Sequence, residues 1–268
     1  MAAAISLVNP ALAACNYGTS SFPRSAAGIK VNTFGYTPTT GPMHWYQMNK
    51  TANVLCAKGR NQSPISLGKS TKIEAGQSLE FKVENATQGA VFENIGTTIQ
   101  VLVNGTMKVD GKYHNMTQFH FHTPSEHKLR DEYYPMEAHF VFEAEDKSLS
   151  VMAFLISLGP TDPLLASIFL HIYDIKSPGR TTRTEPLDFT MLEANVKENL
   201  VWRYTGSLTT PPCTEGVKWY ISQIPLFVNN FTFERVKRVL KFNSRFTQNK
   251  LGQPNLLEES AMEFIKQL

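Results

Sequence analysis

The 268-residue chain lacks any apolar run of the ~20 residues that a membrane-spanning helix requires, so the sequence predicts no membrane span. It also lacks a segment dominated by one sign of charge. Its 26 Lys and Arg residues and 23 Asp and Glu residues are interspersed, and the net charge is only +3. Because nucleic-acid binding needs a concentrated basic surface, we expect no nucleic-acid partner. Repeats and low-complexity tracts are absent too, which argues against a solenoid or a long linker.

Cysteine is scarce in this chain. The three cysteines are Cys15, Cys56 and Cys213, and none belongs to a Cys-x-x-Cys pair. A zinc site built from cysteines is therefore not expected. In an oxidising compartment, two of the three can form a disulfide, which leaves one over. A His-Glu-x-x-His motif is also missing, and this argues against a zinc protease.

The first fourteen residues have features of a secretory signal peptide. They are apolar, and Ala11-Leu12-Ala13 fits the small-x-small pattern that precedes signal-peptidase cleavage. We therefore predict a signal peptide over residues 1–14, a single domain over residues 15–268, and a secreted, extracellular protein. The segment that ends at Cys15 also resembles a bacterial lipoprotein cleavage box. An excess of Asn-x-Ser/Thr sequons favours a eukaryotic secreted glycoprotein; these begin at Asn49, Asn61, Asn85, Asn104, Asn115 and Asn230.

Short alternating runs of hydrophobic and polar residues, separated by turn residues, fill most of the chain and are typical of β-strands. We expect strands at 79–83, 98–103, 116–122, 138–143, 150–158 and 217–224. Helical spacing occurs over 163–171, 192–198 and 232–240. With 42% hydrophobic residues, the chain can bury one large core. The predicted fold is mainly β (α+β), with a large, mostly antiparallel, twisted central β-sheet and short peripheral helices.

Three histidines lie in two of these predicted strands. His120 and His122 are two residues apart and therefore project from the same face of a strand. His139 lies in a second alternating run, which a neighbouring strand can place beside them. Three neutral imidazoles suit a tetrahedral zinc ion whose fourth position is left open, as in catalytic zinc sites. We therefore expect bound Zn²⁺ at the centre of the sheet.

Two polar residues are well placed to orient these rings. A metal-bound imidazole usually donates its other N–H to a carboxylate, amide or carbonyl. Gln118 precedes His120 by two residues and Glu137 precedes His139 by two, so each shares a face with its histidine. The remaining histidines lack this arrangement and are interpreted as non-ligands: His44, His114, His127 and His171.

Four motifs in order make residues 34–254 resemble the α-carbonic anhydrases. They are Gln62-Ser-Pro-Ile65, Gln118-Phe-His-Phe-His122 with Ser125-Glu-His127, Glu137-Ala-His-Phe-Val141, and Tyr204 to Glu215 with its Thr209-Thr-Pro-Pro-Cys213 core. The resemblance implies a carbonic anhydrase, a zinc lyase that hydrates carbon dioxide reversibly to bicarbonate and a proton by means of zinc-bound hydroxide. A weak esterase activity, and inhibition by sulfonamides and anions, are implied as well.

The resemblance also assigns roles to individual residues. Thr209 accepts a hydrogen bond from the hydroxide and donates its own proton to Glu126, and these two are the implied catalytic residues. Cys56 and Cys213 match a disulfide of secreted family members, which leaves Cys15 over. The substrate pocket matches Val141, Val151, Leu208, Thr210, Val217 and Trp219.

The chain departs from the family pattern at Thr97. The family usually has a histidine there that shuttles protons to buffer, and threonine does not titrate near neutral pH. We therefore expect an active enzyme whose turnover is limited by proton transfer. By the same resemblance, Tyr36, Thr97 and Gln100 belong to the network that orders solvent.

Two other interpretations remain open at this stage. One is a non-catalytic relative on the same fold that serves in binding or storage. The other is a cupin, because His120-x-His122 followed by Glu126 matches the start of a cupin metal motif, in which the glutamate is itself a ligand. The glycines that flank the cupin motif are missing, since His114 and Tyr133 stand in their places.

Overall fold

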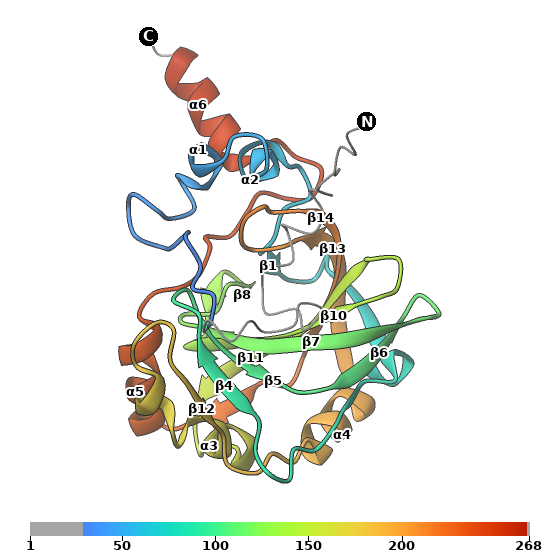
Figure 1. Ribbon diagram of the computed structural model, residues 1–268. Helices are drawn as coiled ribbons and strands as arrows, with labels where there is room; N and C mark the ends of the chain where they lie inside the picture. The colour runs from blue at the N-terminus through green and yellow to red at the C-terminus, as the bar shows by residue number, and fades with distance from the viewer. Residues whose placement is uncertain (1–28, 267–268) are drawn as a thin grey trace, which may run out of the picture.

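The computed structural model describes residues 29–266 (Figure 1). The predicted signal peptide and Cys15 lie outside these residues. Within them, no helix combines the length and the apolar character needed to cross a membrane.

A large twisted sheet forms the centre of the molecule, which confirms the predicted fold class. Its main path follows the order β12-β4-β5-β7-β10-β11-β14-β13-β2, and all pairs along it are antiparallel except β11 with β14. Strands β7 and β10 lie in the middle of this order. The strands of the sheet are β2 Lys72–Ala75, β3 Lys82–Val83, β4 Val91–Asn94, β5 Ile99–Leu102, β6 Gly105–Val109, β7 Lys112–His122, β10 Met136–Glu143, β11 Leu149–Leu158, β12 Thr181–Arg183, β13 Leu200–Ser207, β14 Glu215–Ser222 and β15 Leu226–Val228.

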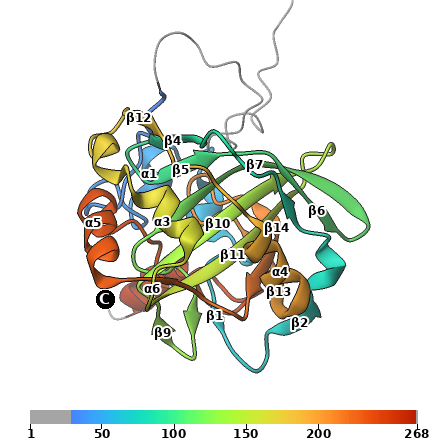
Figure 2. The same cartoon turned by 90° about the horizontal axis from the view of Figure 1, so that it is seen from below.

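Short helices lie around this sheet (Figures 1 and 2). Local sequence explains several of their ends: Pro163 occupies the first turn of α3, and Asn229 caps α5 by accepting the N–H of Thr232 at 2.8 Å. A second sheet has the order β1-β8-β9, with β1 Ser66–Leu67, β8 Lys128–Leu129 and β9 Glu132–Tyr133. The helices are α1 Trp45–Met48, α2 Val54–Lys58, α3 Pro163–Phe169, α4 Thr190–Glu198, α5 Asn230–Leu240 and α6 Leu256–Lys266, with 3₁₀ turns η2 Gly76–Leu79 and η3 Ile172–Ile175.

The two faces of the central strands pack into different clusters. Phe119 and Phe140 stack with ring centroids 4.5 Å apart in the larger apolar core. On the opposite face, a smaller cluster contains Val141, Val151 and Trp219. The histidines of β7 and β10 lie on this second face, because they alternate with the phenylalanines.

Strand β7 contains an irregularity that alternation alone did not predict. Gln118 pairs with Val141, whereas the next pair is Met116 with Phe142, so Thr117 is an extra residue in β7. Such a bulge shifts the alternation of one strand by one residue. As a result, Met116 packs in the apolar core while Gln118 joins the histidine face. The predicted run over 116–122 is thus regular only from Gln118 onward.

The expected strand at 79–83 is mostly wrong. Residues Gly76–Leu79 form a 3₁₀ turn, Glu80 has a φ of 43°, and only Lys82–Val83 pair as a strand. The left-handed backbone at Glu80 interrupts any extended run at this point. Helix α6 has no counterpart in the sequence expectations.

Candidate metal centre

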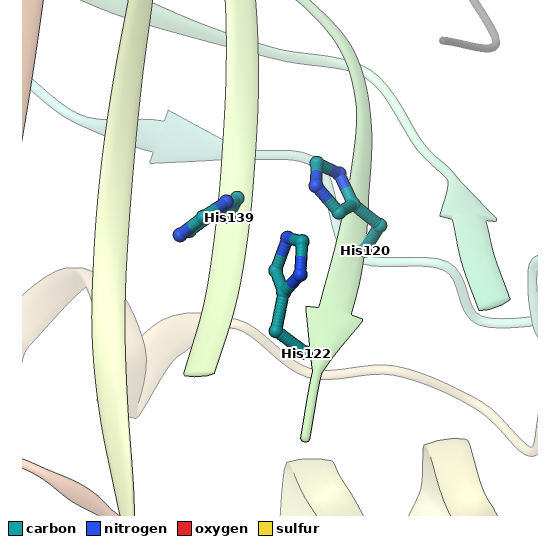
Figure 3. Close-up of side chains that lie close together, drawn as sticks. All are labelled: His120, His122 and His139. Carbon is teal, nitrogen blue, oxygen red and sulfur yellow. The ribbon is translucent and has the colours of Figure 1, made fainter. Parts of the chain in front are cut away.

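Strands β7 and β10 bring His120, His122 and His139 together on one wall (Figure 3). His120 and His139 are direct partners in the antiparallel register, and His122 is two residues further along β7. All three side chains are buried. One ring nitrogen from each lies within 4.8 Å of the other two, so the three form a group that could hold a single metal ion. The structure therefore places the three histidines that the sequence pattern identified close to one another.

A hydrogen bond fixes the orientation of each ring. His120 Nδ1 lies 2.9 Å from Gln118 Oε1, and His139 Nε2 lies 2.8 Å from Glu137 Oε1. These are the two partners expected from sequence. His122 Nδ1 lies 2.8 Å from the backbone oxygen of Asn243, a third acceptor. Because each acceptor takes a ring N–H, the lone pair remains on Nε2 of His120 and His122 and on Nδ1 of His139.

The protonation state of these rings fits a metal ion. Burial lowers the pKa of all three histidines, to about 4 for His122, because a buried imidazolium loses its hydration. The rings are therefore neutral at neutral pH, as ligation requires. The buried Nε2 of His122 has no hydrogen-bond partner among the described residues. Three convergent imidazole lone pairs are a suitable donor set for zinc.

Glu137 is held by more than its contact with His139. Its Oε2 accepts the backbone N–H groups of Glu126 and His127 at 2.8 and 2.9 Å, and its Oε1 also lies 2.6 Å from His127 Nδ1. Burial alone would raise its pKa, but the charges and hydrogen bonds of His127 and His139 hold the pKa well below its usual range. Glu137 is therefore a carboxylate that acts as an acceptor for both rings. The close group of His127, Glu137 and His139 is explained by these hydrogen bonds.

Glu126 is fully buried close to the histidines. Its Oε1 accepts the backbone N–H of Arg245 at 2.8 Å. Burial raises the pKa of Glu126 to about 7, although His139, Arg245 and the Thr209 hydroxyl each act to lower it. Thr209 therefore lies close to this carboxyl group, yet Oε2 accepts no hydrogen bond of ordinary geometry within the described part of the chain. Thr209 and Glu126 are thus neighbours, and the Thr209 hydroxyl is one of the groups that lower the pKa of this carboxyl group.

Most of the expected substrate-pocket residues form one apolar surface beside the metal ligands. Val141, Val151, Val217 and Trp219 belong to the smaller buried cluster, and the partly exposed Leu208 packs against it. The Trp219 ring centroid is 4.8 Å from that of His139, and its indole N–H donates to the Ser207 carbonyl at 3.0 Å. Thr210 is buried, and its carbonyl accepts the N–H of Cys213.

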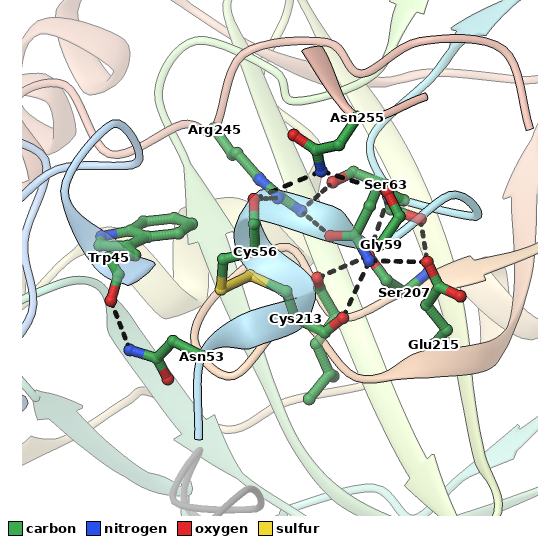
Figure 4. Close-up of a disulfide and its surroundings, with 12 residues drawn as sticks. Trp45, Asn53, Cys56, Gly59, Ser63, Ser207, Cys213, Glu215, Arg245 and Asn255 are labelled. Carbon is green, nitrogen blue, oxygen red and sulfur yellow. Dashed lines mark hydrogen bonds between the residues drawn. A yellow bond between two sulfur atoms is a disulfide. The ribbon is translucent and has the colours of Figure 1, made fainter. Parts of the chain in front are cut away.

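A disulfide joins Cys56 to Cys213, across 157 residues of sequence (Figure 4). Cys213 follows the loop that carries Thr209. Two buried hydrogen bonds reinforce the attachment: Gln62 Nε2 donates to the Cys213 carbonyl at 3.0 Å, and the Ser63 N–H donates to Ser207 Oγ at 2.9 Å. The loop is thus fixed to α2 and to the segment that contains Gln62 and Ser63.

The three expected solvent-ordering residues have different surroundings. The Thr97 hydroxyl accepts from Asn32 at 2.7 Å, and its carbonyl accepts from Asn243 Nδ2 at 3.1 Å. Gln100 pairs in register with His120, and its Nε2 donates to Glu93 at 2.9 Å. Tyr36 lies in an aromatic group with Phe34 and Trp45. No histidine lies at position 97, in agreement with the sequence.

Several residues of the site were not identified from sequence. Asn243 orients His122 through its backbone oxygen, and its side chain accepts the N–H of Thr123 at 2.7 Å. A backbone acceptor leaves no residue-type signal, so sequence reasoning had no means of finding it. His127 was interpreted from sequence as a non-ligand, and its contact with Glu137, which depends on the turn after β7, was not foreseen. Arg245 lies far along the chain from every motif.

The fold and the site define a class of protein with a buried three-histidine centre, oriented for a metal ion, beside an apolar cluster. Comparison with known proteins agrees with this description. The family model described as eukaryotic-type carbonic anhydrase matches residues 40–255. A carbonic anhydrase from Neisseria gonorrhoeae is 36% identical over 206 residues, which cover 75% of this chain and 78% of the relative. The chain therefore belongs to the α-carbonic anhydrase family.

Solved structures show the same relationship. A fungal alpha carbonic anhydrase from Aspergillus oryzae is 43% identical, with a TM-score of 0.83, and the match covers 87% of this chain and 100% of that one. An alpha-carbonic anhydrase from Thermovibrio ammonificans, in complex with the inhibitor sulfanilamide, is 31% identical, with a TM-score of 0.71 and coverage of 81% and 95%. Family membership and the shared fold make the cupin interpretation wrong.

Proposed function

We propose that this protein hydrates carbon dioxide reversibly to bicarbonate and a proton with Zn²⁺ held by His120, His122 and His139. One observation carries the proposal: three buried, neutral imidazoles present oriented ring nitrogens within 4.8 Å of one another beside an apolar cluster. Zinc bound in this way supplies a water molecule whose pKa falls from about 15.7 to about 7, which provides the nucleophile at neutral pH.

The protein's own residues position the reaction. Gln118, Glu137 and the Asn243 carbonyl hold the rings so that their lone pairs point to one place. Burial raises the pKa of Glu126 to about 7, and the Thr209 hydroxyl lies beside this carboxyl group. When Thr209 donates its proton to Glu126, its oxygen is left only as an acceptor for the attacking water. Thr209 is then the residue that orients the nucleophile.

The pocket suits an apolar substrate. Carbon dioxide has no net dipole and cannot compete with water for a polar site, so an apolar wall favours its entry over that of water. Val141, Val217 and Trp219 are nearly fully buried and form such a wall beside His139. Val151, Leu208 and Thr210 complete the proposed pocket. Inhibition by sulfonamides and small anions at the same centre is part of the proposal, and the related Thermovibrio ammonificans enzyme supports it because its structure is a complex with the inhibitor sulfanilamide.

Proton release is the proposed rate-limiting step. Thr97 does not titrate near neutral pH, and its hydroxyl is already bound to Asn32 at 2.7 Å. Tyr36, Thr97 and Gln100 then order solvent without carrying the proton themselves. We infer a slow exit for the proton, which small imidazole buffers accelerate.

The exchange of ¹⁸O between carbon dioxide and water tests this proposal, because it separates hydration from proton transfer. We expect a hydration rate that does not depend on buffer, and a proton-transfer rate that rises with imidazole concentration. The variant Thr97→His should raise the proton-transfer rate by about tenfold or more in the absence of buffer, while hydration stays unchanged. If the wild-type protein and Thr97→His had equal proton-transfer rates, and neither rate responded to imidazole, the proposal that proton release is rate-limiting would be contradicted.

Secretion belongs to the same proposal. The Cys56–Cys213 disulfide is typical of an oxidising compartment, and all six sequon asparagines are exposed. We infer a signal peptide over 1–14, a single domain over 15–268, and glycosylation on some of the six asparagines. A weak esterase activity is proposed on the same centre. If purified protein binds zinc but hydrates no carbon dioxide, a binding or storage role is the better interpretation.

A further inference from the structure

A cavity of about 550 Å³ lies at the edge of the central sheet, and none of the three clustered histidines lines it. It forms where the edge strand β2 is shorter than its neighbour β13. Strand β2 pairs with β13 only between Lys72 and Arg203 at one end and Ala75 and Leu200 at the other. The next residues of β13, Tyr204 and Thr205, extend past β2 and line the cavity. Figure 2 shows β2, β13 and β14 together at this edge.

The lining is strongly basic. It contains four cations, Lys72, Arg203, Lys218 and Lys250, and no carboxylate. Carboxylates outside the lining pair with two of them: Arg203 contacts Glu74, and Lys218 Nζ lies 3.5 Å from an oxygen of Asp110. Within residues 29–266, neither Lys72 nor Lys250 has a carboxylate within ion-pair distance. The cavity thus has an excess of two positive charges.

The strand register concentrates this charge. Lys72 lies directly opposite Arg203 in the β2–β13 pair, and Lys218 lies opposite Thr205 in the neighbouring β13–β14 pair. Like charges directly opposite each other destabilise a strand pair. Glu74 offsets part of this repulsion through Arg203. A bound anion between Lys72, Arg203 and Lys250 would remove the rest, and this is a physical reason to expect an anionic ligand.

The other residues that line the cavity indicate which chemical groups the ligand carries besides its negative charge. Hydroxyl groups of Ser70, Thr71 and Thr205 offer hydrogen bonds to acidic oxygens, whereas Ile65, Tyr204, Tyr220 and Leu251 offer apolar surface. We propose that this cavity is a second binding site, separate from the metal centre, for a small organic anion that carries a carboxylate, sulfonate or phosphate group on a planar apolar body. The volume accommodates one such molecule. This inference does not depend on carbon dioxide hydration.

Benzoate is a suitable probe, and benzamide is its neutral isostere. Each is titrated into the zinc-loaded protein in the presence of excess acetazolamide, which keeps the anion away from the metal. Binding is followed by calorimetry and by residue-resolved NMR shifts. We expect saturable benzoate binding with shifts at Tyr204, Thr205 and Lys218, little binding of benzamide, and weaker benzoate binding at higher salt.

A matched pair of variants tests the charge argument. Replacement of the two unpaired cations, Lys72→Gln with Lys250→Gln, should raise the benzoate Kd at least about tenfold, because two charge-assisted contacts are lost. The control, Lys176→Gln with Lys197→Gln, changes the net charge equally at exposed positions outside the cavity and should leave the Kd within about twofold. The proposal is overturned if benzoate does not bind, if benzamide binds as tightly, or if the two double variants behave alike.

Discussion

Strands β7 and β10 carry two faces of opposite character. One face contributes Phe119, Phe121 and Phe140 to the larger core, and the other presents His120, His122 and His139 to the candidate metal centre. The apolar face needs only shape and volume to pack. Each group on the histidine face instead requires a specific partner, such as the acceptors that orient the three rings. In these two strands, the phenylalanines therefore serve the stability of the core, and the histidines next to them in sequence serve metal binding.

His139 and Phe140 are neighbours in β10 and make the sharpest test of this division. His139→Ala removes one ligand from the centre. We expect hydration to fall by at least about a thousandfold and zinc to be lost, because an open tetrahedral site needs its three protein ligands. The metal-free protein should lose only about 1–2 kcal/mol of unfolding free energy, since Glu137 keeps its contacts with His127. Metal analysis with denaturant unfolding measures both. If His139→Ala still bound one zinc per chain, the assignment of metal binding to the histidine face would be contradicted.

Phe140→Ala should produce the opposite result. Phe140 stacks on Phe119 and contacts Phe81 and Phe154 in the core. Its truncation leaves a cavity and should lower the unfolding free energy by about 3–5 kcal/mol. The folded fraction should still bind one zinc ion and hydrate carbon dioxide. Guanidinium unfolding of the zinc-free protein, followed by zinc titration at low denaturant, gives both readings. A stable variant that has lost zinc would show that the faces are not independent.

Glu137→Gln tests the partners on the histidine face. The amide keeps the size of the side chain but loses the charge that both His127 and His139 contact. We expect zinc affinity to fall about 10–100-fold, which is the usual effect of changing a group that orients a ligand. Competition with a chelator of known affinity measures it. The matched control is Glu143→Gln in the same strand, where the carboxylate meets the exposed Lys147 and zinc affinity should not change.

His114 provides the smallest effect; it lies in β7, at the opposite end of the strand from the candidate metal centre. It is buried against Ser150, and burial lowers its pKa below 6.5; Lys112 lowers this pKa further, whereas Asp146 and Asp110 act to raise it. The unfolded chain therefore takes up this proton at a higher pH than the folded protein does. Stability should fall as the pH decreases through and below about 6.5. His114→Gln should flatten that part of the stability–pH curve of the zinc-free protein, and an unchanged slope would contradict the assignment.

The amount that sequence could predict differs between the two faces. Alternation along a strand is a local pattern. It therefore identified His120 and His122, the phenylalanines on the opposite side of the strand, and the partners Gln118 and Glu137, each two residues before a histidine. The bulge at Thr117 was missed because it depends on how two strands pair, which a single strand does not encode. The Asn243 carbonyl was missed because it comes from a segment distant in sequence and has no side-chain signature.

The fold shows the same limit. The strands around the histidines were predicted because they are long and because their alternation is regular over the residues that carry the histidines. Glu80 interrupts another expected strand with a left-handed conformation that residue type does not reveal. The basic cavity lies where β2 begins opposite Arg203, and strand length at a sheet edge is a property of the assembled sheet.

The most direct test of the central claim is stopped-flow carbon dioxide hydration on protein of measured zinc content, alongside His122→Ala. The account predicts one zinc per chain and a hydration rate that acetazolamide abolishes in the wild-type protein. It predicts neither zinc nor hydration in the variant. Full hydration by His122→Ala, or a zinc-loaded wild-type protein that does not hydrate carbon dioxide, would contradict it.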